Sequence, residues 1–282
     1  MIAGLDHVGL VVRDLDKAAH FAAALGFNLT PRAALTRPGP GGVQEPSGAE
    51  NQCLMFESGY IELLGIVDAS RGHMIVPYLA RREGVHILVL EAADVDGIVA
   101  AARGRGVPLA PAQTWERDVA TAEGARRARF RFTALKQDET PEAFVGVVQH
   151  LTPDVIRPPG STDHKNGAAR LVECIVASDN PGATARQYGQ LGLDVVAGGA
   201  VGANGSMIRI EDPRSLARRF PGTDLPAAPA VVGITIAVRR LPALKDRLAE
   251  RFGAVGADKD AIWIDPKIGF GALWRFIEDP SP

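Results

Sequence analysis

The 282-residue sequence has little of several features that mark particular classes of protein. Its two cysteines, Cys53 and Cys174, lie far apart and in no metal-binding spacing, so we interpret them as buried apolar residues in a reducing compartment. No apolar run approaches the roughly 18 residues of a membrane span. The N-terminus also lacks the basic segment and long apolar stretch of a secretion signal. These absences predict a cytoplasmic protein without membrane contact.

Excess charge is absent as well. The formal net charge is −2, which gives no electrostatic reason to expect nucleic acid or an anionic membrane as a partner. Hydrophobic residues make up 46% of the chain, the usual content of a soluble protein with a full core. The length is that of two domains or of one large pseudo-symmetric domain.

A short stretch near the N-terminus, Leu5–Asp16, contains a lone histidine, His7, among apolar and small residues. Its first part predicts a β-strand, and Asp14 or Asp16 supplies an oxygen that caps a helix running to Leu25. A buried histidine bonded within the core is the commoner case. A histidine on the concave face of a sheet is also a potential metal ligand, because neutral imidazole binds most first-row metals.

The same order of strand, helix and further strands recurs four times. The first strands of the four units are expected at residues 5–12, 84–91, 170–177 and 231–238. In the first unit, further strands are expected at 28–32, 51–56 and 60–67, with a loop at 38–48. Asp94 and Asp179 are the helix caps expected in the second and third units. Each unit alone is too small to bury its sheet face, so the units must pair.

Domain boundaries follow from a segment rich in proline and glycine. Residues 151–167 are expected to be a linker between an N-terminal domain, 1–150, and a C-terminal domain, 168–282.

This pattern resembles the vicinal oxygen chelate superfamily and, within it, the glyoxalase-like branch. The resemblance rests on Leu5-Asp6-His7-Val8 with Asp14-Leu15-Asp16, on Gly59-Tyr60-Ile61-Glu62-Leu63-Leu64, and on Gln149-His150-Leu151-Thr152-Pro153. It implies an α+β fold of four βαβββ modules, paired into two open barrel-like sheets, as in the glyoxalase/bleomycin-resistance/dioxygenase fold. It also implies that one sheet cups a divalent metal ion.

In the resembling family, the metal ligands lie on the first and last strands of each module, and in the first module these positions match His7 and Glu62. Tyr60 and Leu64, which share a strand face with Glu62, are apolar. An outward-facing carboxylate therefore fits poorly, and a paired or metal-binding one fits better.

The second module leaves two alternatives open for its first strand. His7 precedes its cap Asp14 by seven residues, whereas His86 precedes Asp94 by eight. A shift of one residue places a side chain on the opposite face, so Ile87 matches His7 unless a bulge restores His86.

On the last strand of the second module, alignment of Tyr60 with Phe144 places Gly146 opposite the Glu62 position. His150, further along that strand, is then a metal ligand or an acid–base group, or it only hydrogen-bonds the linker. In the third unit, Val172 takes the place of His7, and the fourth unit supplies no ligand. We therefore expect one metal centre, formed by His7, Glu62, His150 and His86, and a degenerate C-terminal half.

Three arginines, Arg127, Arg129 and Arg131, alternate with apolar residues and so share one strand face. A solvated face is the simpler interpretation. The functional one is a clamp for a carboxylate or enolate, complemented by Trp115, Glu116 and Arg117 on a neighbouring strand.

These residues leave three functions open. The first is a metal-dependent lyase, isomerase or hydrolase that chelates a small carbonyl- or carboxylate-bearing metabolite, with Glu62 or His150 moving a proton. The second is an extradiol-type dioxygenase using Fe(II), and the third is a non-catalytic binding or resistance protein. The ligand set accommodates Zn, Ni, Co, Mn or Fe(II). The partner is a small molecule, and the chain is a monomer or a homodimer.

Overall fold

The computed structural model describes residues 1–39, 44–121, 124–136, 139–157, 159–253 and 255–279. The chain forms two eight-stranded mixed sheets, with strand orders β2-β3-β4-β1-β5-β8-β7-β6 and β10-β11-β12-β9-β13-β16-β15-β14. In each sheet the first strands of two modules lie side by side at the centre. The expected α+β fold of four βαβββ modules is confirmed.

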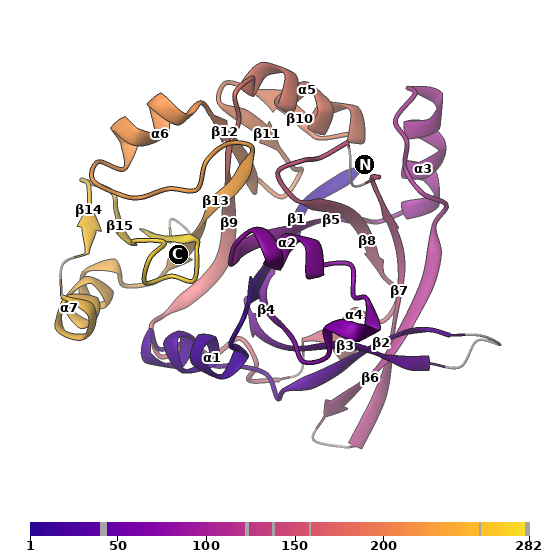
Figure 1. Ribbon diagram of the computed structural model, residues 1–282, viewed down its shortest axis with the longest axis horizontal. Helices are drawn as coiled ribbons and strands as arrows, with labels where there is room; N and C mark the ends of the chain where they lie inside the picture. The colour runs from indigo at the N-terminus through magenta and orange to yellow at the C-terminus, as the bar shows by residue number, and fades with distance from the viewer. Residues whose placement is uncertain (40–43, 122–123, 137–138, 158, 254, 280–282) are drawn as a thin grey trace.

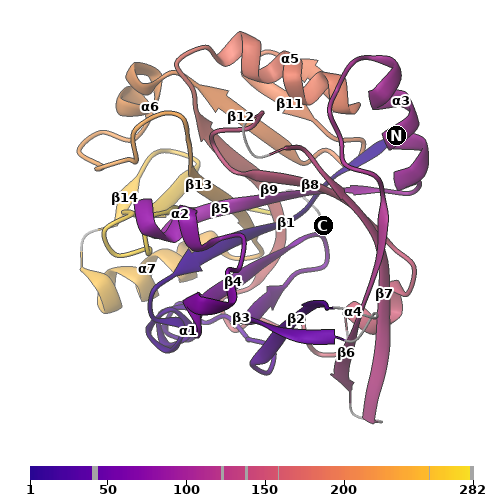
Figure 2. The ribbon, with the colours of Figure 1, turned by 45° about the vertical axis from the view of Figure 1, so that its right-hand side comes forward.

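The strands of the first sheet come from the first two modules: β1 Ile2–Val12, β2 Ala33–Pro38, β3 Gln44–Met55, β4 Tyr60–Ile66, β5 Gly84–Ala92, β6 Gln113–Thr121, β7 Gly124–Ala134 and β8 Phe144–His150. The strands of the second sheet come from the last two: β9 Ala168–Ala177, β10 Asp194–Val196, β11 Gly199–Val201, β12 Met207–Glu211, β13 Ala230–Val238, β14 Gly256–Ala257, β15 Ala261–Ile264 and β16 Leu273–Glu278. Figure 1 shows the first sheet curling into a nearly closed barrel, with the long β6–β7 hairpin at its edge (Figure 2).

Each module contributes one longer helix, and shorter helices lie in the connections: α1 Leu15–Ala24, the 3-10 helix η2 Ala69–Arg71, α2 Val76–Arg81, α3 Val95–Gly104, α4 Pro153–Ile156, α5 Pro181–Leu191, α6 Pro213–Arg219 and α7 Leu241–Phe252. No helix within the described ranges is long and apolar enough to cross a bilayer.

Side-chain caps fix where three of the longer helices begin. Asp14 accepts a hydrogen bond from the Lys17 backbone N–H at 3.0 Å, and Asp94 accepts one from Gly97 at 2.9 Å. In the third module the cap is Asn180, which accepts from Ala183, so the expected cap at Asp179 is wrong by one residue.

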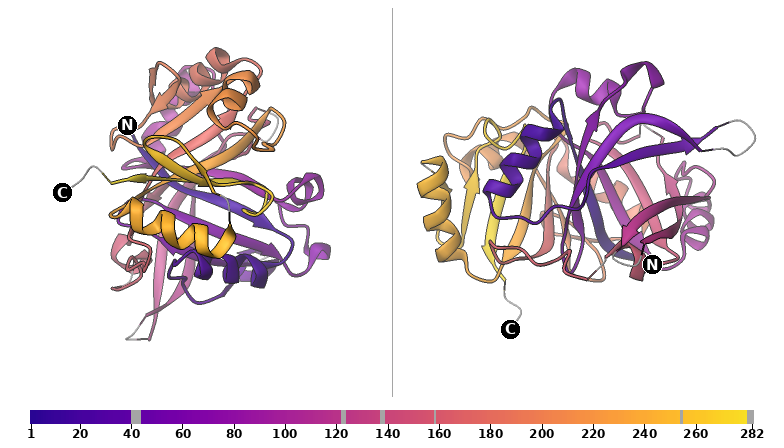
Figure 3. Two further views of the ribbon diagram at one scale, coloured as in Figure 1. Left: turned by 90° about the vertical axis from the view of Figure 1, so that its left-hand side faces the viewer. Right: turned by 90° about the horizontal axis from the view of Figure 1, so that it is seen from below.

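The two sheets pack against each other through one apolar core. Leu5 and Val8 of β1 belong to the same buried cluster as Leu171 and Cys174 of β9. Helix α1 joins this core from the side and lies beside the strands of the C-terminal half in Figure 3. We call the face of each sheet that is turned away from this core its outer face; in the first sheet it is the concave side of the curl, where residues of β2 and β7 belong to one apolar cluster.

The outer face of each sheet is covered in part by short helices. On the first sheet, Ile75 at the start of α2 packs with Val11 and Leu64, while Val155 and Ile156 of α4 pack with a cluster that includes Tyr60 and Cys53. On the second sheet, Leu216 of α6 and Phe220 pack against strand residues that include Ile175 and Trp263.

Some expected elements differ from the observed ones. Residues 28–32 form no strand, and the second strand of the module begins at Ala33. The expected linker, 151–167, contains the short helix α4, which packs on the first sheet rather than running free between domains. Part of the expected loop at 38–48 lies outside the described residues.

The shared core predicts that the two halves unfold together. Phe27, which is 5% exposed, packs its ring against Phe56 of the first half and against Trp274 and Phe276 of the second. We expect Phe27→Ala to lower the free energy of unfolding by about 3–5 kcal/mol. Urea unfolding followed by far-UV circular dichroism and by tryptophan fluorescence should give one coincident, shifted transition. Two separate transitions, of which only one moves, would contradict a shared core.

Candidate active site

Asp6 lies at the centre of the candidate site because of a β-bulge in β1. The pairing of β1 with β5 passes from Leu5 opposite Leu90 directly to His7 opposite Val89, so Asp6 is an extra residue without a partner on β5. Such a bulge turns two consecutive side chains to similar directions. Asp6 and His7 therefore both contribute to the outer face of the first sheet.

The Asp6 carboxylate holds two imidazole rings. His7 Nδ1 lies 2.6 Å from Asp6 Oδ2, and His150 Nε2 lies 2.7 Å from Asp6 Oδ1. Asp6 is 0% exposed. Burial opposes its ionisation, but the hydrogen bonds and charges of His150 and His7 outweigh burial and hold the pKa of Asp6 well below its ordinary value. The carboxylate is thus ionised at neutral pH, and both rings donate an N–H to it.

His7 is the more accessible of the two rings. Its side chain is 13% exposed, and its ring stacks on Tyr60 with centroids 4.3 Å apart. Because Nδ1 is bonded to Asp6, the nitrogen left for other chemistry is Nε2, which has no hydrogen bond within the described part of the chain. A histidine oriented by a carboxylate is the usual arrangement of a general base.

His150 ends β8 and lies opposite Phe130 of β7. Its side chain is 7% exposed, and its Nδ1 atom is buried without a hydrogen-bond partner among the described residues. Such an atom is unfavourable unless a ligand or water satisfies it. The structure brings His7 and His150 together through Asp6.

Glu62 lies on the same outer face, on β4 beside β1, and opposite Gly9. Its Oε1 atom accepts a hydrogen bond from Asn51 Nδ2 at 2.6 Å, and Asn51 is buried. Burial lowers the pKa of the nearby His73, while the charge of Glu62 raises it. In the described structure Glu62 thus interacts with Asn51 and His73 and not with the Asp6 carboxylate.

Register decides which residues of the second module match His7 and Glu62. His7 is opposite Tyr60, and Ile87 is opposite Phe144. In the same way Glu62 corresponds to Gly146 on β8.

Apolar groups fill the space at both of these second-module positions, Ile87 and Gly146. A Cβ atom added at Gly146 would lie 2.6 Å from the Phe132 ring. The Ile87 side chain itself fills the space beside Gly9, where an added Cβ atom would lie 2.8 Å from it.

Only half of the family-type set of metal ligands is therefore present. Two of the four positions, His7 and Glu62, carry donor atoms, whereas Ile87 and Gly146 carry none. Catalytic metal sites generally use three protein ligands, and no group of three His, Cys, Asp or Glu side chains among the described residues could hold an ion. Asp6, His7 and His150 do gather, but there the two imidazoles donate N–H groups to the carboxylate. The residues present do not complete a metal site.

A bulge does occur at His86, but the ring packs against α2 and does not join this group. The pairing of β1 with β5 passes from Gly9–Ile87 to Leu10–Val85, which leaves His86 as the extra residue. Its ring packs on Tyr78 of α2, and Nε2 donates to the Arg82 carbonyl at 3.0 Å. Burial lowers the pKa of His86 to about 4, so the ring is neutral at pH 7. The contacts of His86 support packing of α2 and not a shared ligand set with His7.

Arg127, Arg129 and Arg131 share a face, as their alternation predicts, but it is the face opposite to that of His7. Their strand neighbour Phe130 faces the same side as its partner His150, so the arginines face the other side. Each is paired with a carboxylate there: Arg127 with Glu116 and Asp118, Arg129 with Glu116, and Arg131 with Asp96. The three arginines form a surface ladder of ion pairs, and the substrate clamp stays a prediction.

Of the β6 residues expected to complement the clamp, Trp115 and Arg117 do face the site side. Trp115 packs edge-on against Phe132, with ring centroids 6.2 Å apart. Arg117 is two residues further along the same strand face, and its positive charge acts on Cys53 and Tyr60. No ion pair of Arg117 occurs within the described ranges of the chain.

Sequence reasoning missed the central role of Asp6 and the contributions of Tyr60 and Asn51. Strict alternation along β1 places Asp6 on the face opposite to His7, and no local signal announces the bulge. A carboxylate between Leu5 and His7 on a central strand was the available signal, because a buried carboxylate requires partners.

The lowered pKa of Asp6 predicts a pH-dependent contribution to stability. We expect Asp6→Asn to lower the free energy of unfolding at pH 7 by about 1.5–3 kcal/mol, the value of a hydrogen bond to a charged group. Because the folded-state pKa lies below the unfolded one, this advantage of the wild type is complete above the unfolded pKa of about 3.9 and is lost as pH falls toward the folded pKa. Urea unfolding at pH values from 7 to 3 checks this expectation.

The matched control for this experiment is Asp96→Asn, which removes an exposed carboxylate of α3. It should change stability little at any pH. A difference between wild type and Asp6→Asn that stays constant down to pH 3 would contradict the assignment.

Comparisons with known proteins agree with this fold. A hypothetical protein from Staphylococcus aureus has a structure similar to 98% of this chain and 99% of its own, with a TM-score of 0.67 and 15% identity. A mutant of 4-hydroxymandelate synthase from Streptomyces coelicolor matches 99% of this chain and 93% of its own, with a TM-score of 0.61 and 14% identity.

Methylmalonyl-CoA epimerase from Streptomyces coelicolor, in complex with 2-nitronate-propionyl-CoA, is 22% identical over 54% of this chain and all of its own, with a TM-score of 0.38. At their low identities the two full-length similarities concern the fold alone. No curated protein matches the sequence.

A family model supplies the assignment that these structures do not. The model of the glyoxalase-like domain matches residues 5–200, which include both modules of the first sheet and the start of the second. The chain therefore belongs to the glyoxalase-like domain family of the vicinal oxygen chelate superfamily.

Proposed function

We propose that this protein is an enzyme that moves a proton on a small metabolite bearing a carbonyl or carboxylate group, as a lyase or isomerase does. The observation that carries the proposal is the fully buried Asp6 carboxylate, which holds His7 and His150 and leaves His7 Nε2 available. A stabilising role alone would not need an ionised group between two imidazoles, because apolar residues fill such a position at lower cost.

In this proposal His7 is the base. Its Nε2 atom removes a proton from the carbon next to the substrate carbonyl, and the imidazolium so formed is stabilised by the Asp6 carboxylate on Nδ1. Stacking on Tyr60 holds the His7 ring in one orientation. Burial raises the pKa of Tyr60 far above its ordinary value, so its hydroxyl keeps its proton.

Glu62 and His150 are the proposed partners for proton return: one of them, in its protonated form, gives a proton to the substrate and is reprotonated from solvent, and His7 releases the proton it took to solvent. The Oε2 atom of Glu62 lies on the same outer face as His7, while Asn51 fixes Oε1. His150 Nδ1 is a buried nitrogen whose hydrogen-bonding capacity is unused among the described residues. A substrate oxygen that reached it would receive a hydrogen bond from the ring in its protonated form.

In this proposal Arg117, and not the three arginines of β7, binds the negatively charged group of the substrate. It is half-buried on the site side of β6 and free of ion pairs within the described residues, and guanidinium groups bind carboxylates through two parallel hydrogen bonds. Trp115, on the same strand face, supplies an apolar surface beside it.

Hydrogen exchange tests this proposal. We expect the wild type to catalyse proton–deuterium exchange, followed by NMR, on at least one member of a panel of 2-oxo acids, 3-oxo acids and 2-hydroxy carbonyl compounds. His7→Ala should slow the exchange by about 10²–10⁴-fold, the usual contribution of a general base. His20→Ala, which changes an exposed histidine of α1, is the matched control and should exchange at the wild-type rate.

Two outcomes would overturn the proton-transfer mechanism. One is a His7→Ala variant that exchanges as fast as the wild type. The other is a wild type that binds members of the panel without exchanging a proton, which would favour the non-catalytic binding protein.

A metal-dependent enzyme is the second candidate, favoured by one observation. The ring N–H of His7 is bonded to a buried carboxylate, which is the usual surrounding of a histidine that ligates a metal. Only His7 and Glu62 of the four family-type positions carry donor atoms, so this candidate requires a further ligand that the described residues do not bring to the site.

Elemental analysis decides between the two candidates. After incubation with Zn, Ni, Co, Mn or Fe(II), a metalloenzyme should retain near-stoichiometric metal, His7→Ala and Glu62→Ala should lose it, and His86→Gln should keep it. Iron as the retained metal would favour a dioxygenase. A wild type that retains no metal after reconstitution would contradict the second candidate.

A further inference from the structure

The outer face of the second sheet carries a group of charged residues at the positions that correspond to the candidate active site. The pairing of β9 with β13 passes from Thr235–Glu173 directly to Ile236–Leu171, so Val172 is the extra residue of a bulge. The bulge at Asp6 in β1 has the same form. Glu173, and not Val172 as the sequence suggested, is the equivalent of His7.

The other three positions follow from strand register. Arg209 on β12 is opposite Ile175, as Glu62 is opposite Gly9. Arg275 on β16 is opposite Thr235, as Gly146 is opposite Val89. The four positions that hold His7, Glu62, Ile87 and Gly146 in the first sheet hold Glu173, Arg209, Gly233 and Arg275 in the second.

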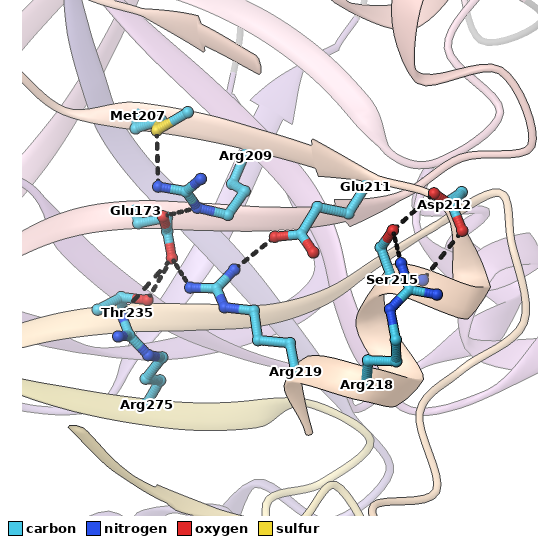
Figure 4. A network of polar contacts seen from close by, with 10 residues as sticks. All are labelled: Glu173, Met207, Arg209, Glu211, Asp212, Ser215, Arg218, Arg219, Thr235 and Arg275. Carbon is cyan, nitrogen blue, oxygen red and sulfur yellow. Dashed lines mark hydrogen bonds and ion pairs between the residues drawn. The ribbon is translucent and has the colours of Figure 1, made fainter. Parts of the chain in front are cut away.

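Glu173 is buried and is contacted by several cationic side chains (Figure 4). Arg209 Nε pairs with its Oε2 atom, and Arg219 Nη2 of α6 lies 3.3 Å from Oε1. Thr235 donates a hydrogen bond to Oε1 at 2.9 Å. Burial opposes the ionisation of Glu173, but the arginines and Thr235 outweigh it and lower its pKa. Glu173 is therefore already satisfied by two arginines and a threonine.

Arg275 is the surplus cation of this group. Its Nη1 atom lies 3.8 Å from Glu173 Oε1, beyond hydrogen-bonding distance, and its Nε atom is buried without a partner among the described residues. The Arg275 side chain is only 13% exposed. Burial lowers the pKa of Arg275 and the negative charge of the exposed Asp258 raises it, but Arg275 and Asp258 form no ion pair in the described structure. Burying a guanidinium in this way is unfavourable unless an acceptor binds it.

We propose that the outer face of the second sheet binds a small oxyanion, a phosphate or carboxylate group, between Arg275, Arg209 and Arg219. The planar guanidinium presents a fork of N–H donors that matches the oxygens of both groups. Arg209 and Arg219 are 30% and 21% exposed, so the group reaches solvent from which an anion enters. Among the described residues the Glu211 carboxylate engages only Arg219, at 2.7 Å, and leaves Arg275 to the ligand.

Calorimetric titration of the full chain at constant ionic strength tests this site, with inorganic phosphate and malonate as separate probes and sodium chloride as the reference salt. We expect one site per chain, and the tighter of the two probes identifies the group that the site recognises. Arg275→Gln should weaken binding by about tenfold or more, since a hydrogen bond to a charged group contributes about 1.5–3 kcal/mol.

Two further variants keep the test decisive. Arg219→Gln changes α6 and leaves the sheet intact, and it should also weaken binding. Arg218→Gln is the matched control, because Arg218 is an exposed arginine of α6 that bonds Ser215 and not Glu173, and it should bind as the wild type does.

A purely structural role for the arginines predicts the opposite pattern. In that case neither phosphate nor malonate would bind or raise the Tm of the wild type above that in sodium chloride, and Arg275→Gln would lower the Tm without anion. That result would overturn the proposal. An anion-dependent rise in Tm that Arg275→Gln abolishes and Arg218→Gln retains would support it.

Discussion

The burial of Asp6 is the constraint on which the rest of the first sheet's chemistry depends. A carboxylate removed from water is unfavourable unless hydrogen bonds and opposite charge replace its hydration. Asp6 obtains them from His7, its neighbour on β1, and from His150 at the end of β8. These strands belong to different modules, so the carboxylate is satisfied only after the two modules have paired through β1 and β5. Assembly of the sheet and assembly of the candidate site are one event.

The same backbone irregularity serves both halves of the chain. A bulge in β1 places Asp6 beside His7, and a bulge in β9 places Val172 beside Glu173. In the first half the extra residue is the buried acid, whereas in the second half it is apolar and the acid stands in the next position, where arginines surround it. Bulges are retained features that redirect side chains, and here a repeated bulge supports two different polar groups.

Much of the fold could be predicted from the sequence because its signals are local. Alternating apolar residues gave the strands, and Asp14 and Asp94 gave two helix starts. Counting back from these caps also matched Ile87 to His7, as the strand register does. Two things could not be predicted. The bulge that turns Asp6 toward His7 leaves no local pattern, and alternation shows that arginines share a face without showing which face meets the core.

Repetition of one module explains how a single chain carries two opposite kinds of polar group. The scaffold fixes where four side chains meet, not which residues stand there, so a fold hosts many chemistries. In the first sheet the meeting residues surround a carboxylate with imidazoles, which suits proton transfer near pH 7. In the second they surround a carboxylate with guanidinium groups, which keep their charge at any physiological pH. The first arrangement is suited to reaction and the second to retention of an anion. Because the two outer faces point away from a common apolar core, each group is free to engage a ligand of its own.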